Sequence, residues 1–139
     1  MSGSFVIDSS IGFAWVHPSQ ATAETQSLLR EVHAGATIVV PELWFLEIAN
    51  GFLVLQRRKK LAAGERKTAL ESLGRLNLLV DGDSVKAAFY KTSEIAEKHE
   101  LTVYDAVYLE LALRRGLPLA SRDQSLNRAA RTLGVECPC

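Results

Sequence analysis

Short apolar runs alternate along the chain with longer stretches in which apolar residues recur at helical spacing. The runs are rich in β-branched and aliphatic side chains, which fit buried strands. They predict strands at residues 5–7, 37–40, 78–80 and 117–120, with room for a short last strand at 134–136. The helical spacing predicts helices over residues 11–15, 19–33, 42–55, 64–76, 84–96, 103–115 and 124–133. This alternation is typical of an α/β domain in which helices cover both faces of a mainly parallel sheet.

Local signals mark where several of these helices begin and end. Ser19 can cap the second helix, and Thr102 can cap the helix that Gly116 then stops. Pro41 suits the first turn of helix 42–55, because its missing N–H would be unpaired there in any case. This helix is apolar on nearly every side, so we expect it to be deeply packed.

Asp8 follows the first predicted strand directly, as the apolar run Phe5-Val6-Ile7 ends. It should therefore lie at the carboxyl end of a parallel strand, the edge where ligands bind in open α/β sheets. A second interpretation is that Asp8 or Ser9 merely caps the helix that follows. The residue alone does not decide between these interpretations.

Three more acidic residues stand in similarly apolar surroundings. Glu47 lies inside the most apolar helix, Asp105 lies near a helix start, and Asp123 follows a strand as Asp8 does. Each could instead interact with a helix N-terminus or point out of a narrow polar seam. If all four converge, their repulsion calls for a cation, and oxygen ligands suit Mg²⁺ or Mn²⁺. Such a site is suited to phosphodiester hydrolysis.

Composition narrows the alternatives. The 139 residues carry a formal net charge of zero and suffice for one domain, which we place over residues 1–139. The sequence shows neither an apolar run that could span a bilayer nor a signal peptide, so we expect a cytoplasmic protein without a membrane association. Cys137 and Cys139 are expected to form a reduced, frayed tail. Nucleophile-elbow, phosphate-loop and dinucleotide-binding motifs are absent from the sequence.

Four segments together resemble the PIN-domain family, and more closely the toxin ribonucleases of VapBC toxin–antitoxin pairs. They are residues 5–10, 41–50, 101–112 and 118–126. The resemblance implies a three-layer α/β/α sandwich and a Mg²⁺- or Mn²⁺-dependent endoribonuclease. It also implies a small VapB-type antitoxin as partner and a homodimer. Open alternatives are a PIN-type nuclease without a toxin role, a non-catalytic PIN-like binding module, and a metal phosphatase acting on small molecules.

The resemblance assigns roles to individual residues. It implies catalytic roles for Asp8, Glu47, Asp105 and Asp123, with metal bound by Asp8, Asp105 and Asp123. Auxiliary positions are Ser9, Asn50 and Ser121, and Asn50 shares a helix face with Glu47. The residues expected to meet RNA phosphates are Arg57, Arg58, Lys59, Lys60 and Arg122. A charge run such as 57–60 can equally be a solvated helix end.

Overall fold

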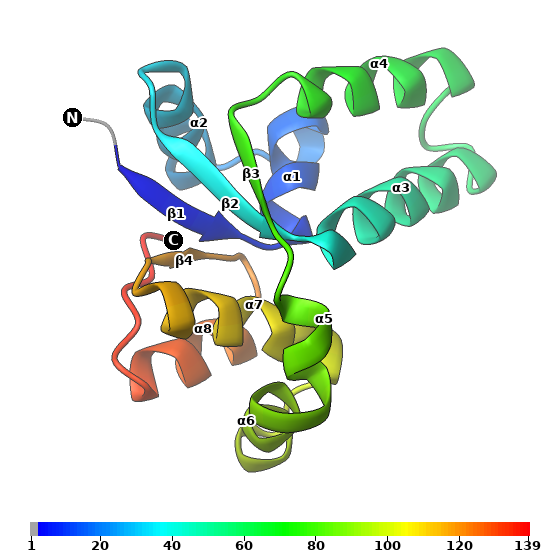
Figure 1. Cartoon of the computed structure of the whole chain (residues 1–139). Helices are drawn as coiled ribbons and strands as arrows, with labels where there is room; N and C mark the ends of the chain where they lie inside the picture. Colours follow the sequence, from blue (N-terminus) through cyan, green and yellow to red (C-terminus); the bar gives the residue numbers. More distant parts are fainter. Residues whose placement is uncertain (1–2) are drawn as a thin grey trace.

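The computed structural model describes residues 3–139, and a parallel four-stranded sheet lies at its centre (Figure 1). The strands are β1 (Ser4–Ile7), β2 (Thr37–Pro41), β3 (Leu78–Asp81) and β4 (Leu119–Ala120), in the order β3-β2-β1-β4. The apolar side chains of β1 and β2 are buried, as central strands covered on both faces require. The sequence therefore located these four strands and their parallel arrangement correctly.

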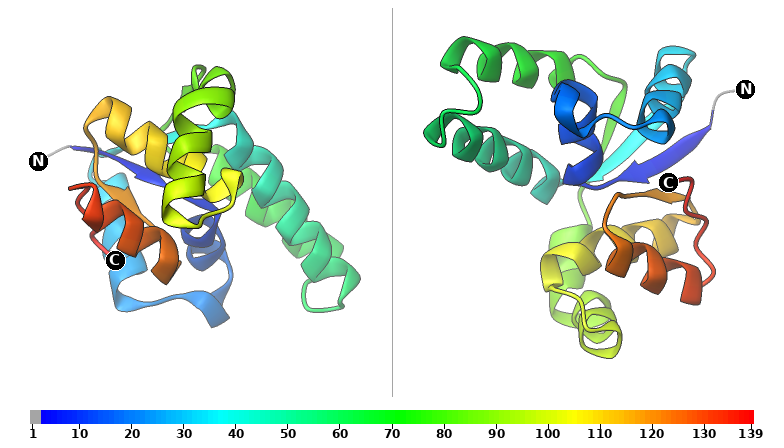
Figure 2. Two further views of the ribbon diagram at one scale, coloured as in Figure 1. Left: turned by 90° about the horizontal axis from the view of Figure 1, so that it is seen from below. Right: turned by 180° about the vertical axis from the view of Figure 1, so that it is seen from behind.

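Helices lie on both sides of this sheet and complete three layers (Figures 1 and 2). On one side are α1 (Ser9–Val16), the 3₁₀ turn η1 (Pro18–Gln20), α2 (Ala23–His33), α3 (Glu42–Arg57) and α4 (Ala63–Gly74). On the other are α5 (Ser84–Ala87), the π-helical turn η2 (Ala88–Thr92), α6 (Ser93–His99), α7 (Val103–Arg115) and α8 (Gln124–Thr132). Within residues 3–139, the helices include none that is long and apolar enough to cross a membrane.

Local capping signals predicted both ends of α7 correctly but the start of α2 incorrectly. The Thr102 hydroxyl accepts a hydrogen bond from Asp105 N at 3.0 Å, and Gly116 ends α7 in the left-handed region, as predicted. The prediction that α2 begins at Ser19 is wrong. Thr22 is its cap, because the side chains of Thr22 and Thr25 each bond to the other's backbone N–H.

The expectation that α3 is deeply packed is also wrong. Only Trp44, Ile48 and Phe52 are buried, at a four-residue spacing that forms a single stripe. Leu46 remains 71% exposed. Figure 2 shows the reason, since α3 and α4 extend away from the sheet as a pair and leave the outer side of α3 uncovered.

The contact between α1 and α3 depends on a glycine. A Cβ atom at Gly51 would lie 2.1 Å from the ring of Phe13, which packs edge-on against Phe52. We expect Gly51→Ala to lower the free energy of unfolding by about 1–3 kcal/mol, because the ring must move out of its packed position. Urea denaturation measures this change. The matched control is Gly64→Ala in the first turn of α4, where no atom lies within 4 Å. A Gly51→Ala variant as stable as this control would contradict the packing described.

The C-terminal segment packs against the domain, so the expectation of a frayed tail is wrong. Leu119 N donates to Glu136 O at 2.9 Å, although residues 134–136 do not form the anticipated strand. Cys137 and Cys139 are free and half-buried, and burial raises the pKa of the Cys139 thiol to about 11. A thiol with so high a pKa is largely protonated at neutral pH and correspondingly unreactive.

Candidate active site

Asp8 lies at the junction of β1 and α1, with 5% of its surface exposed. It is the N-cap of α1, and Oδ1 accepts a hydrogen bond from Ile11 N at 3.3 Å. Asp8 therefore does cap α1, and it also lies at the carboxyl edge of the sheet. The same oxygen also accepts from the Ser10 hydroxyl at 2.5 Å, which leaves Asp8 rigidly oriented at the carboxyl edge of the sheet.

The turn after β4 lies beside Asp8 on this edge, because β1 and β4 are neighbouring parallel strands. The Ser121 hydroxyl donates to Asp8 Oδ2 at 2.5 Å and accepts from Asp123 N at 2.9 Å. Asp123 in turn caps α8, with Oδ1 accepting from Leu126 N at 2.8 Å. One hydroxyl thus connects the two aspartates that follow β1 and β4.

Two helices bring the remaining carboxylates to the same place. Asp105 stands in the first turn of α7, and the Tyr108 hydroxyl one turn later donates to Glu47 on α3. Trp44, one turn before Glu47, donates from Nε1 to the backbone oxygen of Asp8 at 3.3 Å. These contacts fix the start of α3 and of α7 around Asp8.

Each of three carboxyl groups has a pKa raised above its ordinary value. Burial raises the pKa of Asp8 most, its hydrogen-bonding neighbours oppose the rise, and the charge of Asp105 adds to it. Burial also raises the pKa of Glu47, against the Tyr108 hydrogen bond and with repulsion from Asp105 and Asp8. Burial and the charge of Asp123 raise the pKa of Asp105. Repulsion between neighbouring carboxylates therefore adds to burial in raising these three pKa values.

A donor set made of carboxylates and hydroxyls, with mutual repulsion among its charges, has the chemistry that Mg²⁺ or Mn²⁺ requires. Residues 3–139 contain no group of three His, Cys, Asp or Glu side chains placed to hold an ion. The fit is therefore one of charge and donor type. An ion bound here would relieve the repulsion that raises the pKa of Asp105 and Glu47.

The auxiliary residues expected from the sequence differ in the contacts that they make. Ser121 contacts Asp8 as described, whereas Ser9 and Asn50 make no side-chain hydrogen bond in the part of the chain described. Ser10 and Tyr108 hold the carboxylates and were not anticipated in these roles. Ser10 directly follows Ser9, and Tyr108 is one helical turn from Asp105, so spacing alone could have pointed to Tyr108.

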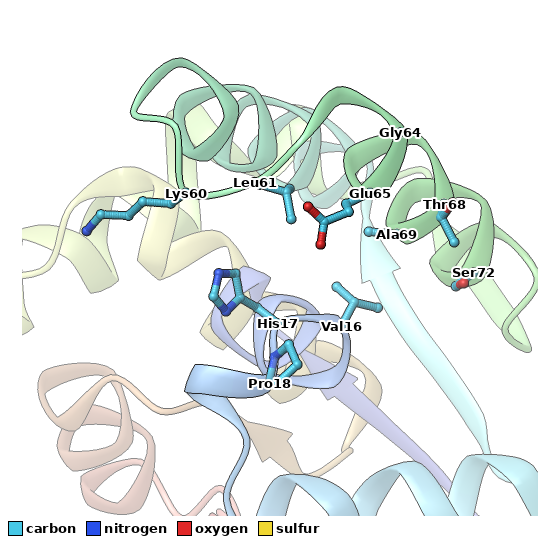
Figure 3. Close-up of a pocket in the computed structure, with 10 residues that line it drawn as sticks. All are labelled: Val16, His17, Pro18, Lys60, Leu61, Gly64, Glu65, Thr68, Ala69 and Ser72. Atoms are coloured by element: carbon cyan, nitrogen blue, oxygen red, sulfur yellow. The ribbon is translucent and has the colours of Figure 1, made fainter.

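The basic residues expected to meet RNA differ in their distance from the acidic residues. Arg57 lies ten residues beyond Glu47 on α3, about 15 Å farther along the helix axis, and residues 58–60 form the turn that follows the helix. Lys60 instead lines a cavity of about 720 Å³ between α4 and the end of α1, where Figure 3 shows it with His17. Arg122 is close to the acidic residues, since its backbone N donates to Ser10 Oγ at 2.9 Å.

A parallel α/β fold with acidic residues at its carboxyl edge places them where such folds bind ligands, and it is suited to metal-dependent hydrolysis. The family model of the PIN domain matches residues 5–132, and the chain belongs to the PIN domain family. PIN domains are typically nucleases and generally use divalent metal ions. None of the curated protein sequences compared with this chain gives a significant match.

Solved structures agree on the fold. PAE2754 from Pyrobaculum aerophilum superimposes with a TM-score of 0.70 at 19% identity, covering 97% of this chain and 83% of that one. VapBC2 from Rickettsia felis, bound to a DNA fragment from its promoter, gives a TM-score of 0.66 at 12% identity, covering 96% of each chain. FitAcB from Neisseria gonorrhoeae gives a TM-score of 0.65 at 17% identity, covering 96% of this chain and 95% of that one.

Proposed function

We propose that this chain is a Mg²⁺- or Mn²⁺-dependent endoribonuclease whose active site is the acidic cluster formed by Asp8, Glu47, Asp105 and Asp123. The observation that carries the proposal is the gathering of these residues at the carboxyl edge of the sheet by the hydrogen bonds of Ser121, Tyr108 and Trp44. Asp8, Asp105 and Asp123 would hold the ion. When bound, the ion supplies a lowered pKa for an attacking water and neutralises charge on the phosphate.

Side chains of the protein have the other roles in the proposed reaction. Ser10 and Ser121 fix both carboxylate oxygens of Asp8 and favour its ionised form, since hydroxyl donation lowers the pKa of that group. Glu47 accepts the proton of the attacking water, because a carboxylate with a raised pKa is a stronger base than an exposed one. Tyr108 holds Glu47 in place for this transfer.

Product analysis tests this reaction. Attack by water leaves a phosphate on one RNA fragment and a hydroxyl on the other, whereas attack by the neighbouring 2′-hydroxyl leaves a cyclic phosphate. Mass spectrometry of the fragments should therefore show no cyclic phosphate. Faster hydrolysis of a phosphorylated small molecule than of RNA would favour the metal phosphatase instead.

Tyr108→Phe tests the role of Glu47. Loss of one hydrogen bond to a charged group costs about 1.5–3 kcal/mol, so kcat should fall about tenfold or more, with KM for RNA little changed. The pH–rate profile should move as well, because Tyr108 lowers the pKa of Glu47 and its removal raises that pKa further. A purely structural tyrosine would lower protein stability without moving the profile.

We further propose that the chain is the toxin of a type II toxin–antitoxin pair, acting in the cytoplasm as a homodimer. Similarity to VapBC2 and FitAcB supports this role. Exposed apolar side chains support protein partners, because such surface in a small domain marks interaction sites. The most exposed ones are Leu46, Val85, Phe89, Tyr90 and Tyr104.

Expression in a bacterial host tests the toxin role. The wild-type chain alone should arrest growth, and co-expression of a small antitoxin encoded next to it should restore growth. Asp8→Asn expressed to the same level should be harmless. Growth that is unaffected by an active nuclease would favour a PIN nuclease without a toxin role.

A further inference from the structure

A cavity of about 660 Å³ adjoins the acidic cluster. Ser121 belongs to both sites, because it lines the cavity and donates to Asp8 Oδ2 at 2.5 Å. Arg122 follows Ser121 in the cavity wall, and α8 contributes Arg128 and Arg131. The cavity is therefore a basic space directly beside an acidic one.

The amphipathic pattern of α8 produces this wall. Leu126 and Ala130 are buried against the core, whereas Gln124, Arg128 and Arg131 stand four and seven residues apart and share the outer face. The sequence alone gave no reason to treat this outer face as more than a solvated surface. The fold changes that conclusion by placing it next to Ser121.

The arginines retain donors for a ligand. Within residues 3–139, the Arg128 side chain makes no hydrogen bond or ion pair. Arg122 and Arg131 each donate one long bond of 3.4 Å, to Gln20 and to the backbone oxygen of Cys139. Among the described residues that line the cavity, Glu24 is the one acidic side chain beside three arginines, so positive charge prevails. Guanidinium groups with free donors are suited to phosphate.

Asn127 supplies an independent sign of a ligand. The residue lines the same cavity and is only 6% exposed. Nδ2 donates to Ser121 O at 2.9 Å, which fixes the amide so that Oδ1 is an acceptor, and Oδ1 has no partner in the described chain. A buried acceptor without a partner is costly, unless a ligand donates to it.

We propose that this cavity binds the sugar and phosphate next to the bond that is cleaved. Arg128 and Arg131 hold the phosphate, and Asn127 Oδ1 accepts a hydrogen bond from the ribose 2′-hydroxyl. The inference rests on the proposed nuclease function and adds a source of preference for RNA over DNA, because only RNA carries that hydroxyl. Basic side chains at this position also offset the repulsion between the acidic cluster and the RNA backbone.

Binding measured without cleavage tests the proposal. Fluorescence anisotropy in EDTA gives the Kd of the whole protein for a single-stranded RNA and for DNA of the same sequence, over a range of KCl concentrations. The double variant Arg128→Ala, Arg131→Ala should weaken RNA binding at least tenfold, and the slope of log Kd against log[salt] should fall by about 1.4 for two lost contacts. Asn127→Ala should remove most of the difference between RNA and DNA.

Arg75→Ala is the matched control, since Arg75 follows α4 at the opposite, amino edge of the sheet and pairs only with exposed Glu71. Its Kd should equal that of the wild type. Equal binding by the double variant and this control, or no RNA binding by the wild type, would overturn the proposal. RNA binding that depends on Arg128 and Arg131 in a protein that cleaves no RNA would support the cavity site and refute the nuclease. If Asn127→Ala fails to fold, the arginine variants still test whether the cavity binds RNA.

Discussion

Asp105→Asn is expected to lower the rate of RNA cleavage by about a thousandfold while making the metal-free protein more stable at neutral pH. The loss of rate follows because an amide removes a charged ligand from the acidic cluster. The gain in stability follows from the raised pKa of Asp105, whose causes are burial and the charge of Asp123. A carboxyl group with a raised pKa favours folding below its ordinary pKa, and this contribution is lost as the pH rises through the folded-state value.

Single-turnover cleavage and urea denaturation in EDTA measure the two effects. The control is Asp83→Asn, because the Asp83 side chain is 78% exposed and its carboxylate lies outside the acidic cluster. That variant should cleave like the wild type. Mn²⁺ should stabilise the wild type more than Asp105→Asn, since binding to the folded state raises stability by mass action. A cleavage rate unchanged by Asp105→Asn would contradict its assignment.

Asp81→Ala is expected to lower the free energy of unfolding by about 3 kcal/mol at pH 7. The Asp81 side chain is fully buried at the end of β3. It accepts from Arg114 at 2.8 and 2.9 Å, from Arg115 Nε at 3.0 Å and from Ser84 Oγ at 2.7 Å. These bonds join the edge strand to the end of α7, the helix whose first turn carries Asp105.

The same contacts give this stability a defined pH dependence. Arg114, Ser84 and Arg115 hold the pKa of Asp81 well below its usual range, against the effect of burial. The contribution is therefore complete above the ordinary pKa of about 4 and is lost as the pH falls toward the folded-state value. Urea denaturation at pH 7 and pH 3 should show a smaller difference between wild type and Asp81→Ala at the lower pH. A difference that grows on acidification would contradict the ion-pair account.

The sequence predicted the fold wherever the signal was local. The β-branched runs located the strands, and Thr102 and Gly116 defined α7 because capping depends on adjacent residues. The packing of α3 could not be predicted, because an apolar helix does not reveal which of its faces the core will cover. The fold leaves the face containing Leu46 in solvent.

The same contrast between local signals and the whole fold explains which parts of the candidate site could be predicted. Asp8 was recognisable because a carboxylate at the end of a buried strand is unusual, and its place beside the Ser121 turn followed from parallel topology. The choice of Ser10 over Ser9 depends on the capping geometry of Asp8, which the sequence does not specify. Asn127 was missed because its unpartnered oxygen exists only in the folded chain.

The most direct test of the central claim is cleavage of a pool of structured RNAs by the purified protein. The assay compares Mg²⁺, Mn²⁺ and EDTA, with Asp8→Asn measured beside the wild type. We expect cleavage with either metal, none in EDTA, and none by an Asp8→Asn variant that is folded. Cleavage that persists in EDTA, or in folded Asp8→Asn, would contradict a metal-dependent active site at the acidic cluster.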